Sequence, residues 1–295
     1  MAANTRIEQL KQRLQEGFLI GDGGMGTRLR GEGLRAGESE ELLNVERPGP
    51  VRTAHRAFLD AGSDIIQTNT FQGNTISLAR RGLAERVAEL NRAGAAIARE
   101  VVGERAFVAG SIGPTGGILE PYGELEEDVA RRAFSEQAQA LAEGGVDFFI
   151  VETFSAVEEI EVAIEAAGET GLPVAASMAF DPSGRTAFGV SPEQAAERLE
   201  ATAAMVIGAN CGTISPAEMV GIVAGFREAT SLPLLAQPNA GRPQQTDSGV
   251  IYPEPPDTLA DAAERFRDLG AAIIGGCCGS TPDHIRAIAA RVRGG

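Results

Sequence analysis

The sequence predicts a single-domain (β/α)8 barrel, the TIM barrel fold, that spans residues 1–295. Three observations predict it: the length, the number of short apolar runs, and the helical patterns between those runs. The chain has 295 residues, and barrels of this kind are typically about 250 residues long. Hydrophobic residues make up 43% and charged residues 23% of the chain, values typical of a globular protein with a sizeable core.

Eight short apolar or β-branched runs are the expected strands. They are residues 18–24, 64–71, 106–113, 146–154, 173–180, 205–212, 233–241 and 271–279. Eight strand–helix units favour a closed barrel, and an open doubly wound sheet is the alternative that the count leaves.

Amphipathic segments with apolar residues at helical spacing lie between the runs. Clear examples are residues 51–62, 126–145, 156–171, 191–202 and 258–270. The N-terminus is also helix-like, and a final helix is expected after Ser280-Thr281-Pro282. Two segments rich in Gly, Pro and Glu are expected as long loops, residues 31–50 and 241–256.

Charge and hydropathy exclude two classes of partner. The formal net charge is −15 and the sequence pI is about 4.7, so nucleic acid and anionic membrane surfaces would repel the chain. The polar N-terminus has no apolar signal-peptide region, and no stretch of about 18 apolar residues occurs. We therefore expect a cytoplasmic protein without a membrane or nucleic-acid partner.

The three cysteines carry the strongest chemical signal. An odd number does not suit a disulfide framework in a chain this long. Cys211 ends the sixth expected strand, and Cys277 and Cys278 end the eighth, so all three meet at the rim where barrel sites form. Thiolates select zinc, and catalytic zinc usually keeps three protein ligands and one open position. The alternatives are a core role for Cys211 with an incidental Cys-Cys pair, or a redox pair, which the strained ring between adjacent cysteines disfavours.

Such a site favours transfer of an alkyl group to sulfur. A zinc ion with three thiolates has a net negative charge and activates water poorly, but it can hold a further thiol as a nucleophilic thiolate. A barrel lyase with a hard metal would instead need carboxylate or histidine ligands.

Other rim residues suit an amino-acid thiol as substrate. Asp22 and Glu152 are candidates to bind its α-ammonium group. The backbone N–H groups of the turn from Gly23 to Gly26, Gly24 included, are candidates to bind its carboxylate. Asn239 is a candidate to add an orienting hydrogen bond. Capping or ion pairing is the alternative for the two carboxylates. His55 and His284 lie in helical segments, and we expect surface or packing roles for them.

Seven motifs resemble the homocysteine S-methyltransferase family, which includes the homocysteine-binding module of cobalamin-dependent methionine synthase. They are GDGGMGT, DIIQTNTF, GSIGPTG, ETFSAVEEI, GANCG, QPNAGRP and GGCCGSTPDHI. The resemblance covers nearly the whole chain. It implies that Cys211, Cys277 and Cys278 bind Zn²⁺, that the sulfur of L-homocysteine becomes the fourth ligand, and that Asp22, Glu152 and Asn239 hold the amino-acid end.

The methyl donor is less well determined. The motifs GSIGPTG, QPNAGRP and VIYPEPP look more like the methionine synthase module than the betaine-using branch. The chain has no tryptophan and two tyrosines, so few aromatic residues are available to form a cage around the quaternary ammonium group of betaine. No folate or cobalamin module accompanies the motifs. We therefore expect the methyl donor to be methylcobalamin on a separate chain, and S-methylmethionine or S-adenosylmethionine is the alternative donor. The alternative class of protein is a non-catalytic subunit that binds homocysteine or zinc. Candidates for the donor side are Phe71, Phe154, Phe180 and Tyr252. Core packing is the alternative role for the three phenylalanines.

Overall fold

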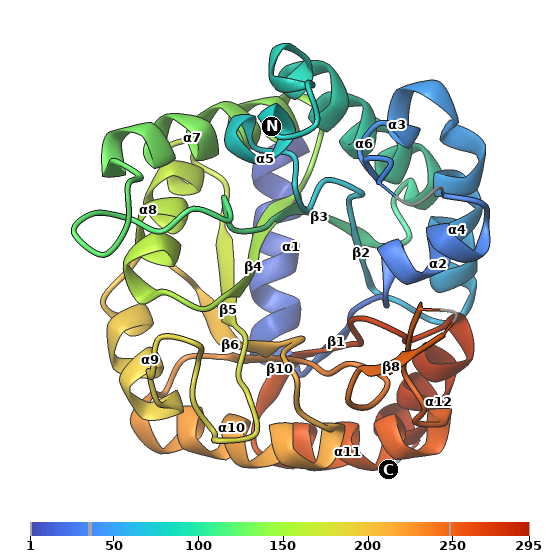
Figure 1. Ribbon diagram of the computed structural model, residues 1–295. Helices are drawn as coiled ribbons and strands as arrows, with labels where there is room; N and C mark the ends of the chain where they lie inside the picture. The colour runs from blue at the N-terminus through green and yellow to red at the C-terminus, as the bar shows by residue number, and fades with distance from the viewer. Residues whose placement is uncertain (1, 35–36, 248, 295) are drawn as a thin grey trace.

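All eight expected strands are present and form one parallel sheet that curves into a nearly closed barrel (Figure 1). The computed structural model describes residues 2–34, 37–247 and 249–294. The strands are β1 (Leu19–Ile20), β2 (Ile65–Gln67), β3 (Phe107–Ile112), β4 (Phe148–Phe154), β5 (Val174–Met178), β6 (Val206–Asn210), β7 (Leu234–Gln237) and β10 (Ala271–Ile274). Their order around the barrel is β1-β10-β7-β6-β5-β4-β3-β2.

The strands β1 and β2 stand at the two ends of this order, and hydrogen bonds that involve two aspartates bridge the seam between them. Asp64 donates its backbone N–H to the carbonyl of Ile20 at 2.7 Å, and its Oδ2 accepts from the N–H of Ile20 at 2.9 Å. Further along, Oδ2 of Asp22 accepts from the backbone N–H of Gln67 at 2.9 Å. Carboxylates therefore stand where a regular parallel ladder would use backbone carbonyls.

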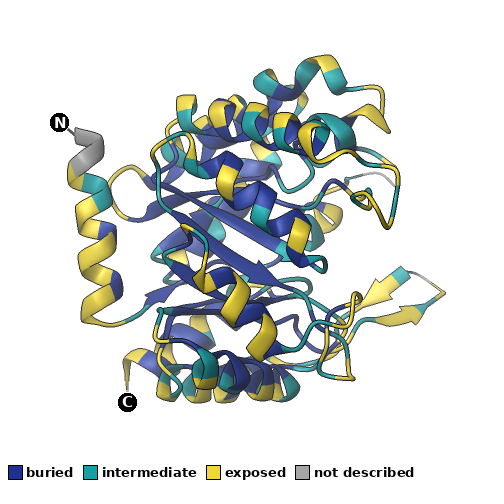
Figure 2. Ribbon diagram, turned by 90° about the vertical axis from the view of Figure 1, so that its left-hand side faces the viewer, coloured by how far each residue is buried: buried dark blue, intermediate teal, exposed yellow. Residues whose placement is uncertain are grey.

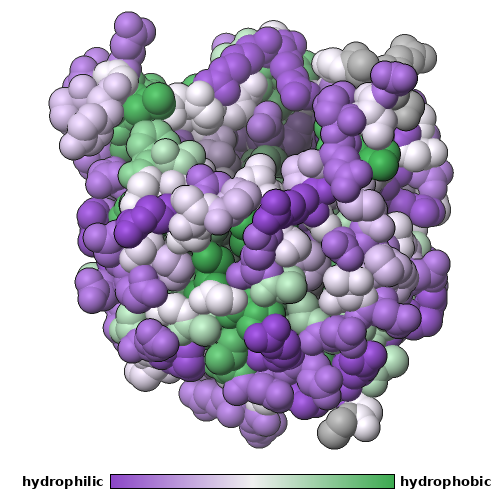
Figure 3. Space-filling view, turned by 60° about the horizontal axis from the view of Figure 1, so that its bottom comes forward, coloured by the Kyte–Doolittle hydropathy of each residue, from purple (hydrophilic) through white to green (hydrophobic). Residues whose placement is uncertain are grey.

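Twelve α-helices and one 3-10 turn surround the strands in the described residues. The helices are α1 (Ala2–Glu16), α2 (Met25–Gly31), α3 (Leu43–Glu46), α4 (Pro48–Asp60), α5 (Thr75–Ala79), α6 (Val87–Val102), α7 (Glu127–Glu143), α8 (Val157–Gly168), α9 (Pro192–Glu200), α10 (Pro216–Ala229), α11 (Pro256–Asp268) and α12 (Pro282–Arg293), and the 3-10 turn is η1 (Ala84–Arg86). The five clear helical segments and the final helix are thus confirmed. Hydrophilic side chains cover most of the face displayed in Figure 3, as amphipathic helices around a barrel require.

The strands read as continuous apolar runs because both faces of the sheet are buried. Alternate residues such as Ile66, Val108 and Phe149 pack outward against the helices. Their neighbours, including Phe107 and Phe148, pack with each other in a second cluster. Since strand side chains alternate in direction, this second cluster fills the barrel interior.

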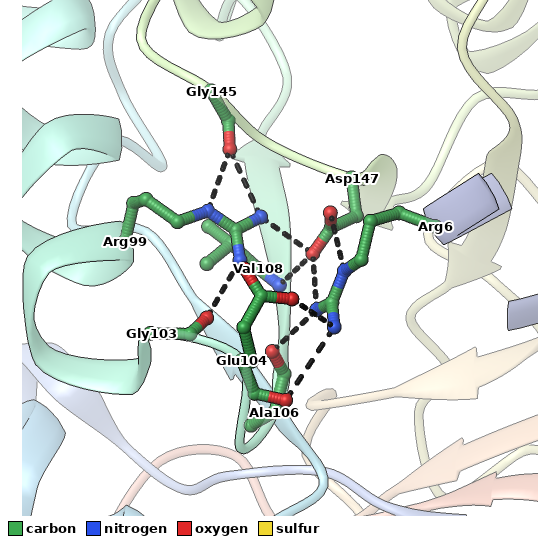
Figure 4. A network of polar contacts seen from close by, with 8 residues as sticks. All are labelled: Arg6, Arg99, Gly103, Glu104, Ala106, Val108, Gly145 and Asp147. Carbon is green, nitrogen blue, oxygen red and sulfur yellow. Dashed lines mark hydrogen bonds and ion pairs between the residues drawn. The ribbon is translucent and has the colours of Figure 1, made fainter. Parts of the chain in front are cut away.

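Helix α1 closes the amino-terminal end of the barrel (Figures 1 and 2). Leu10 and Leu14 join the interior cluster. Beside them, the buried carboxylate of Asp147 pairs with Arg6 at 3.1 Å and with Arg99 at 2.6 Å (Figure 4). Hydrophobic burial and a paired charge therefore fix this helix opposite the end where the expected site residues lie.

The two expected long loops contain regular structure. Residues 31–50 include α3 and the start of α4, with residues 35–36 outside the described part. Residues 241–256 contain an antiparallel hairpin, β8 (Gln244–Thr246) and β9 (Gly249–Ile251), which projects from the carboxyl-terminal rim (Figure 2). Its side chains are mostly exposed, so no buried alternation marked these strands in the sequence. Among the described residues, no helix combines the length and apolar character that a membrane span needs.

Candidate active site and metal centre

A cavity of about 310 Å³ opens where the carboxyl ends of the strands meet. Its wall takes residues from seven strand ends: Gly23 and Gly24 after β1, Gln67, Ser111, Glu152, Cys211, Gln237, and Cys277 and Cys278 after β10. This is the end at which (β/α)8 barrels carry their active sites.

The three cysteines come together in this wall, as the sequence predicted. All three sulfur atoms lie within 4.8 Å of one another, and the sulfurs of Cys211 and Cys278 are 3.9 Å apart. Three thiolates on a tetrahedral zinc ion, each at about 2.3 Å, would be roughly 3.8 Å apart. The cluster therefore fits three ligands around one zinc ion, and its spacing is far from the S–S bond of about 2.0 Å in a disulfide.

The backbone around the cysteines is fixed by the segment after β7. The N–H of Cys211 donates to the carbonyl of Gln237 at 3.0 Å, and the N–H of Cys277 donates to the carbonyl of Pro238 at 2.8 Å. Cys211 and Thr153 are the non-glycine residues in the described chain with positive φ, 55° and 65°. Such conformations cost about 1–3 kcal/mol each and concentrate at functional sites, so both strained residues lie where the chemistry is expected.

A ring of polar side chains surrounds Glu152 inside the barrel. Its Oε1 accepts hydrogen bonds from Gln67 at 2.7 Å and from Ser111 at 2.6 Å. Its Oε2 accepts from Asn210 at 3.0 Å, and Gln237 donates to the side-chain oxygen of Gln67 at 2.7 Å. Burial raises the pKa of Glu152 to about 7, against the lowering effect of the Ser111 hydrogen bond.

The sequence did not single out Gln67, Ser111, Asn210 and Gln237 as site residues. A usable signal was present for three of them, because Gln67, Ser111 and Gln237 each stand two residues after an apolar residue of the interior cluster. In β3 and β4 the interior positions read Phe107, Ala109, Ser111 and Phe148, Ile150, Glu152. Each series is apolar at first and becomes polar at the carboxyl end, where the cavity begins.

Asp22 lies behind the cavity wall rather than on it. The residue is only 1% exposed and is not among those that line the cavity, because its carboxylate bridges the seam to Gln67. Burial raises its pKa well above the usual value, and the nearby charge of Glu152 raises it further.

Gly23 and Gly24 do line the cavity. The N–H of Gly24 already donates to Ser280, whose carbonyl and hydroxyl oxygens both lie at 3.2 Å. A Cβ at Gly24 would lie 2.7 Å from the carbonyl oxygen of Cys277. The glycine turn is therefore packed directly against the loop that carries two of the cysteines.

Asn239 also lies behind the cavity wall. It is 1% exposed, and its Nδ2 donates to the carbonyl of Gly212 at 2.8 Å. It supports the turn after Cys211 from behind and is not among the lining residues.

Both histidines have packing roles. His55 is fully buried in α4, and burial lowers its pKa to about 3, so it packs as a neutral ring. In His284, Nδ1 accepts from the N–H of Thr281 at 3.1 Å and caps α12.

The aromatic candidates separate into two groups. Phe154 packs with Phe134 and Phe180 with Phe226, with ring centroids 6.0 Å apart in each pair, so both belong to the core. Phe71 lines the cavity. Tyr252 is half-buried and packs against Gly279, where a Cβ would lie 2.2 Å from Cβ of the tyrosine.

The fold and the site define a class of protein: a (β/α)8 barrel with three converging thiols at the carboxyl ends of its strands. Residues 19–292 match the family described as homocysteine S-methyltransferase. The chain belongs to this family and is a methyltransferase.

Relatives agree with this assignment. The chain is 34% identical to methionine synthase of Mycobacterium leprae over 97% of its own length and 25% of that protein. It is 38% identical to betaine–homocysteine S-methyltransferase 1 of Bos taurus, over 94% of this chain and 73% of that protein. The chain therefore spans about a quarter of the methionine synthases that it matches.

Among solved structures, the metallated homocysteine methyltransferase MmuM from Escherichia coli is similar, with a TM-score of 0.78 and 25% identity. The match covers 93% of this chain and 96% of that one.

Proposed function

We propose that this protein forms L-methionine by methyl transfer to the sulfur of L-homocysteine, using a zinc ion held by Cys211, Cys277 and Cys278. The donor in this proposal is methylcobalamin carried by a separate chain. The observation that carries the proposal is the cluster of three sulfurs within 4.8 Å of one another in the cavity wall.

The donor set supports zinc. Three thiolates suit zinc better than magnesium or calcium, which prefer oxygen ligands. When bound, zinc would hold a fourth thiol as a thiolate at neutral pH, which makes its sulfur nucleophilic without a general base.

Protein groups near the cysteines suit the amino-acid end of the substrate. Glu152 lines the cavity and is the acceptor we assign to the α-ammonium group. The interaction requires the ionised carboxylate, which the hydrogen bonds from Ser111 and Gln67 favour. Asp22 holds the backbone N–H of Gln67 from behind. We assign the N–H groups of the turn from Gly23 to Gly26, apart from that of Gly24, which donates to Ser280, to the substrate carboxylate.

Two groups of relatives support different donors. The methionine synthases match over 97% of this chain, which supports methylcobalamin. A small sulfonium donor, S-methylmethionine or S-adenosylmethionine, is the second candidate, because the homocysteine methyltransferase MmuM is matched over 96% of its chain and is thus about the size of this barrel. Betaine is disfavoured because Phe71 is the one aromatic residue among the described residues that line the cavity, and a quaternary ammonium is usually held by several.

The test is methionine formation by the purified, zinc-loaded protein, measured by mass spectrometry. Homocysteine is supplied in parallel with methylcobalamin, S-methylmethionine, S-adenosylmethionine or betaine. Turnover with methylcobalamin is the expected result, whereas turnover with one small donor alone would replace it with a self-sufficient enzyme. Absence of methionine with every donor would overturn the proposal.

A further inference from the structure

Strand β4 has a bulge at its carboxyl end, where the cavity begins. The register against β5 shifts between Val151 and Phe154. The two residues between them, Glu152 and Thr153, therefore stand opposite one residue of β5. Bulges of this kind re-aim side chains and are frequent next to active sites. Thr153 also has a left-handed backbone, with a φ of 65°, which a β-branched residue seldom adopts.

The bulge brings two successive side chains to the cavity. Side chains of a regular strand alternate between the two faces of a sheet, and Phe149 and Val151 accordingly pack outward in the cluster against the helices. Glu152 lines the cavity, so a regular strand would turn the next side chain outward. Instead, Thr153 lines the cavity as well, and outward packing resumes at Phe154. The left-handed residue thus adds a polar side chain to the cavity wall.

Cys211 reaches the cavity in the same way. It follows Asn210, the last residue of β6, it has a φ of 55°, and it lines the cavity. Among the non-glycine residues that the structure describes, only Cys211 and Thr153 have a positive φ. At Cys211 this conformation brings a thiol to the proposed metal site. Strained conformations concentrate at functional sites, which indicates that the hydroxyl at Thr153 also contacts a ligand.

Hydrogen bonds hold this hydroxyl and leave its proton available. Nδ2 of Asn210 donates to Oγ1 of Thr153 at 2.7 Å, and Oδ1 of Asn210 accepts from the backbone N–H of Thr153 at 2.8 Å. The hydroxyl oxygen is thus already an acceptor, and its proton remains to be donated. The acceptor that the protein provides, Oε2 of Glu152, is 3.5 Å away, whereas O–H···O hydrogen bonds are usually about 2.7–2.8 Å long. Thr153 therefore offers a hydrogen-bond donor to a ligand in the cavity.

We propose that Thr153 is a further substrate-binding residue, whose hydroxyl donates a hydrogen bond to the α-carboxylate of homocysteine. The inference rests on the proposed function, in which Glu152 binds the α-ammonium group. Both groups are bonded to the same carbon atom of the substrate, so a donor on the residue next to Glu152 suits the carboxylate. A carboxylate has two oxygens with about four acceptor sites, enough for this hydroxyl and for the N–H groups of the turn after β1.

The test measures the binding of thiols to the zinc-loaded full chain by titration calorimetry. Thr153→Val removes the hydroxyl and keeps the branched shape, and Thr153→Ser keeps the hydroxyl. Thr153→Gly also removes the hydroxyl, and glycine adopts a positive φ without strain, so a loss of binding shared by the valine and glycine variants does not come from the backbone. Thermal unfolding checks that each variant folds.

Thr202→Val is the matched control. Thr202 is partly buried, as Thr153 is, and its hydroxyl donates to the carbonyl of Leu199 at 2.6 Å. It is not among the residues that line the cavity. The control therefore loses a threonine hydroxyl and its hydrogen bond at a place that the substrate does not reach.

Each protein is titrated with L-homocysteine and with 3-aminopropane-1-thiol, which is homocysteine without its carboxylate. We expect the Kd of homocysteine to rise about 10–100-fold in Thr153→Val and Thr153→Gly, the effect of losing a hydrogen bond to a charged group. It should stay near the wild-type value in Thr153→Ser and Thr202→Val. The Kd of 3-aminopropane-1-thiol should be the same in Thr153→Val as in the wild type.

Two results would overturn the inference and leave the proposed function intact. One is a wild-type Kd for homocysteine in Thr153→Val and Thr153→Gly. The other is an equal loss of affinity for both thiols, because the hydroxyl would then act on the ammonium or sulfur end of the substrate. Homocysteine binding that depends on Thr153, without methionine formation from any donor, would overturn the proposed function alone, since calorimetry does not require turnover.

Discussion

Nδ2 of Asn210 donates a hydrogen bond to Oε2 of Glu152 at 3.0 Å and so joins the carboxyl end of β6 to that of β4 across β5. The same amide group donates to Oγ1 of Thr153 at 2.7 Å, and its Oδ1 accepts from the backbone N–H of Thr153 and from Ser177, both at 2.8 Å. Asn210 immediately precedes Cys211. One buried side chain therefore links Glu152, the strained Thr153 and the loop that begins at Cys211.

Asn210→Ala should weaken both folding and substrate binding. It leaves Oε2 of Glu152 and the N–H of Thr153 short of buried partners, at about 1–3 kcal/mol each. We expect the free energy of unfolding to fall by about 2–6 kcal/mol and the KM for homocysteine to rise about tenfold or more. Urea unfolding and steady-state kinetics measure the two effects. Ser177→Ala, which removes one donor to the same Asn210 oxygen, is the control and should change KM little; an unchanged KM in Asn210→Ala would contradict the role assigned to the network.

The buried carboxyl of Glu152 should make the metal-free protein less stable as pH rises. Burial raises its pKa from 4.5 to about 7 in the folded state. Between these values the unfolded chain releases a proton that the folded chain keeps, so the stabilisation present below pH 4.5 is lost progressively up to about pH 7. The full shift corresponds to about 3 kcal/mol.

Urea unfolding of the metal-free protein at pH 5 and pH 8 measures this dependence. Glu152→Gln should lose most of the difference between the two pH values, because glutamine does not titrate. Glu124→Gln, at an exposed position, should keep the wild-type difference. Equal pH dependence in the wild type and Glu152→Gln would show that another group is responsible.

The sequence predicted the barrel because its strands are buried on both faces. Apolar runs such as 106–113 and 146–154 stand out clearly from the helical patterns on either side. The cysteines could also be placed, since two alternate strands of a closed barrel bring their carboxyl ends to one rim. Both inferences depend only on chain order and periodicity.

The positions of Asp22 and Asn239 could not be predicted in the same way. Whether a strand-end carboxylate points into the cavity or bridges a seam depends on how β1 meets β2, and β1 has only two residues. Asn239 lies behind the Cys211 turn because the segment after β7 passes beneath it. The β8–β9 hairpin lacks a buried face, so periodicity gave no sign of it.

Loss of the charge on Asp147 should destabilise the barrel without altering its chemistry. Its carboxylate is 5% exposed and pairs with Arg6 and Arg99. Removing one partner of a buried ion pair typically costs about 3–5 kcal/mol, so Asp147→Asn should lower the free energy of unfolding by about that amount. Glu104→Gln removes another carboxylate that pairs with Arg6, but this one is 87% exposed and should cost under about 1 kcal/mol.

Urea unfolding at neutral pH distinguishes the two variants, and activity per folded molecule should be that of the wild type in both. Equal stability losses would show that the network drawn in Figure 4 does not depend on the buried charge.

Cys211→Ser should remove zinc and nearly all methyl transfer. A serine hydroxyl stays protonated where a thiol is readily ionised by the metal, so the site loses one of three ligands. Zinc content by mass spectrometry and methionine formation measure the two effects. Thr213→Ser, an exposed change two residues along the same loop, should keep both. A Cys211→Ser protein with full zinc content and activity would disprove the metal site.

Gly24→Ala tests whether the glycine turn and the loop that carries Cys277 and Cys278, here called the metal loop after its proposed role, must remain in contact. The backbone of Gly24, with φ of −67° and ψ of 88°, is open to alanine, so any effect comes from the added methyl group. That methyl would meet the carbonyl oxygen of Cys277 at 2.7 Å and Cα of Cys278 at 3.3 Å. Both neighbours are backbone atoms of the metal loop, and they can yield only if the two cysteines move.

We therefore expect Gly24→Ala to bind zinc at least tenfold more weakly than the wild type, with a matching loss of activity. Gly31→Ala is the matched control. Gly24 caps the start of α2 and Gly31 is its last residue, and a Cβ at Gly31 would meet no atom within 4 Å. Alanine is favoured over glycine in a helix by about 1 kcal/mol, so the control should be slightly more stable and should bind zinc normally. Chelator competition and thermal unfolding measure these outcomes. If Gly24→Ala keeps wild-type zinc affinity, the metal loop can shift without disturbing its sulfurs, and the close contact has no part in holding the metal.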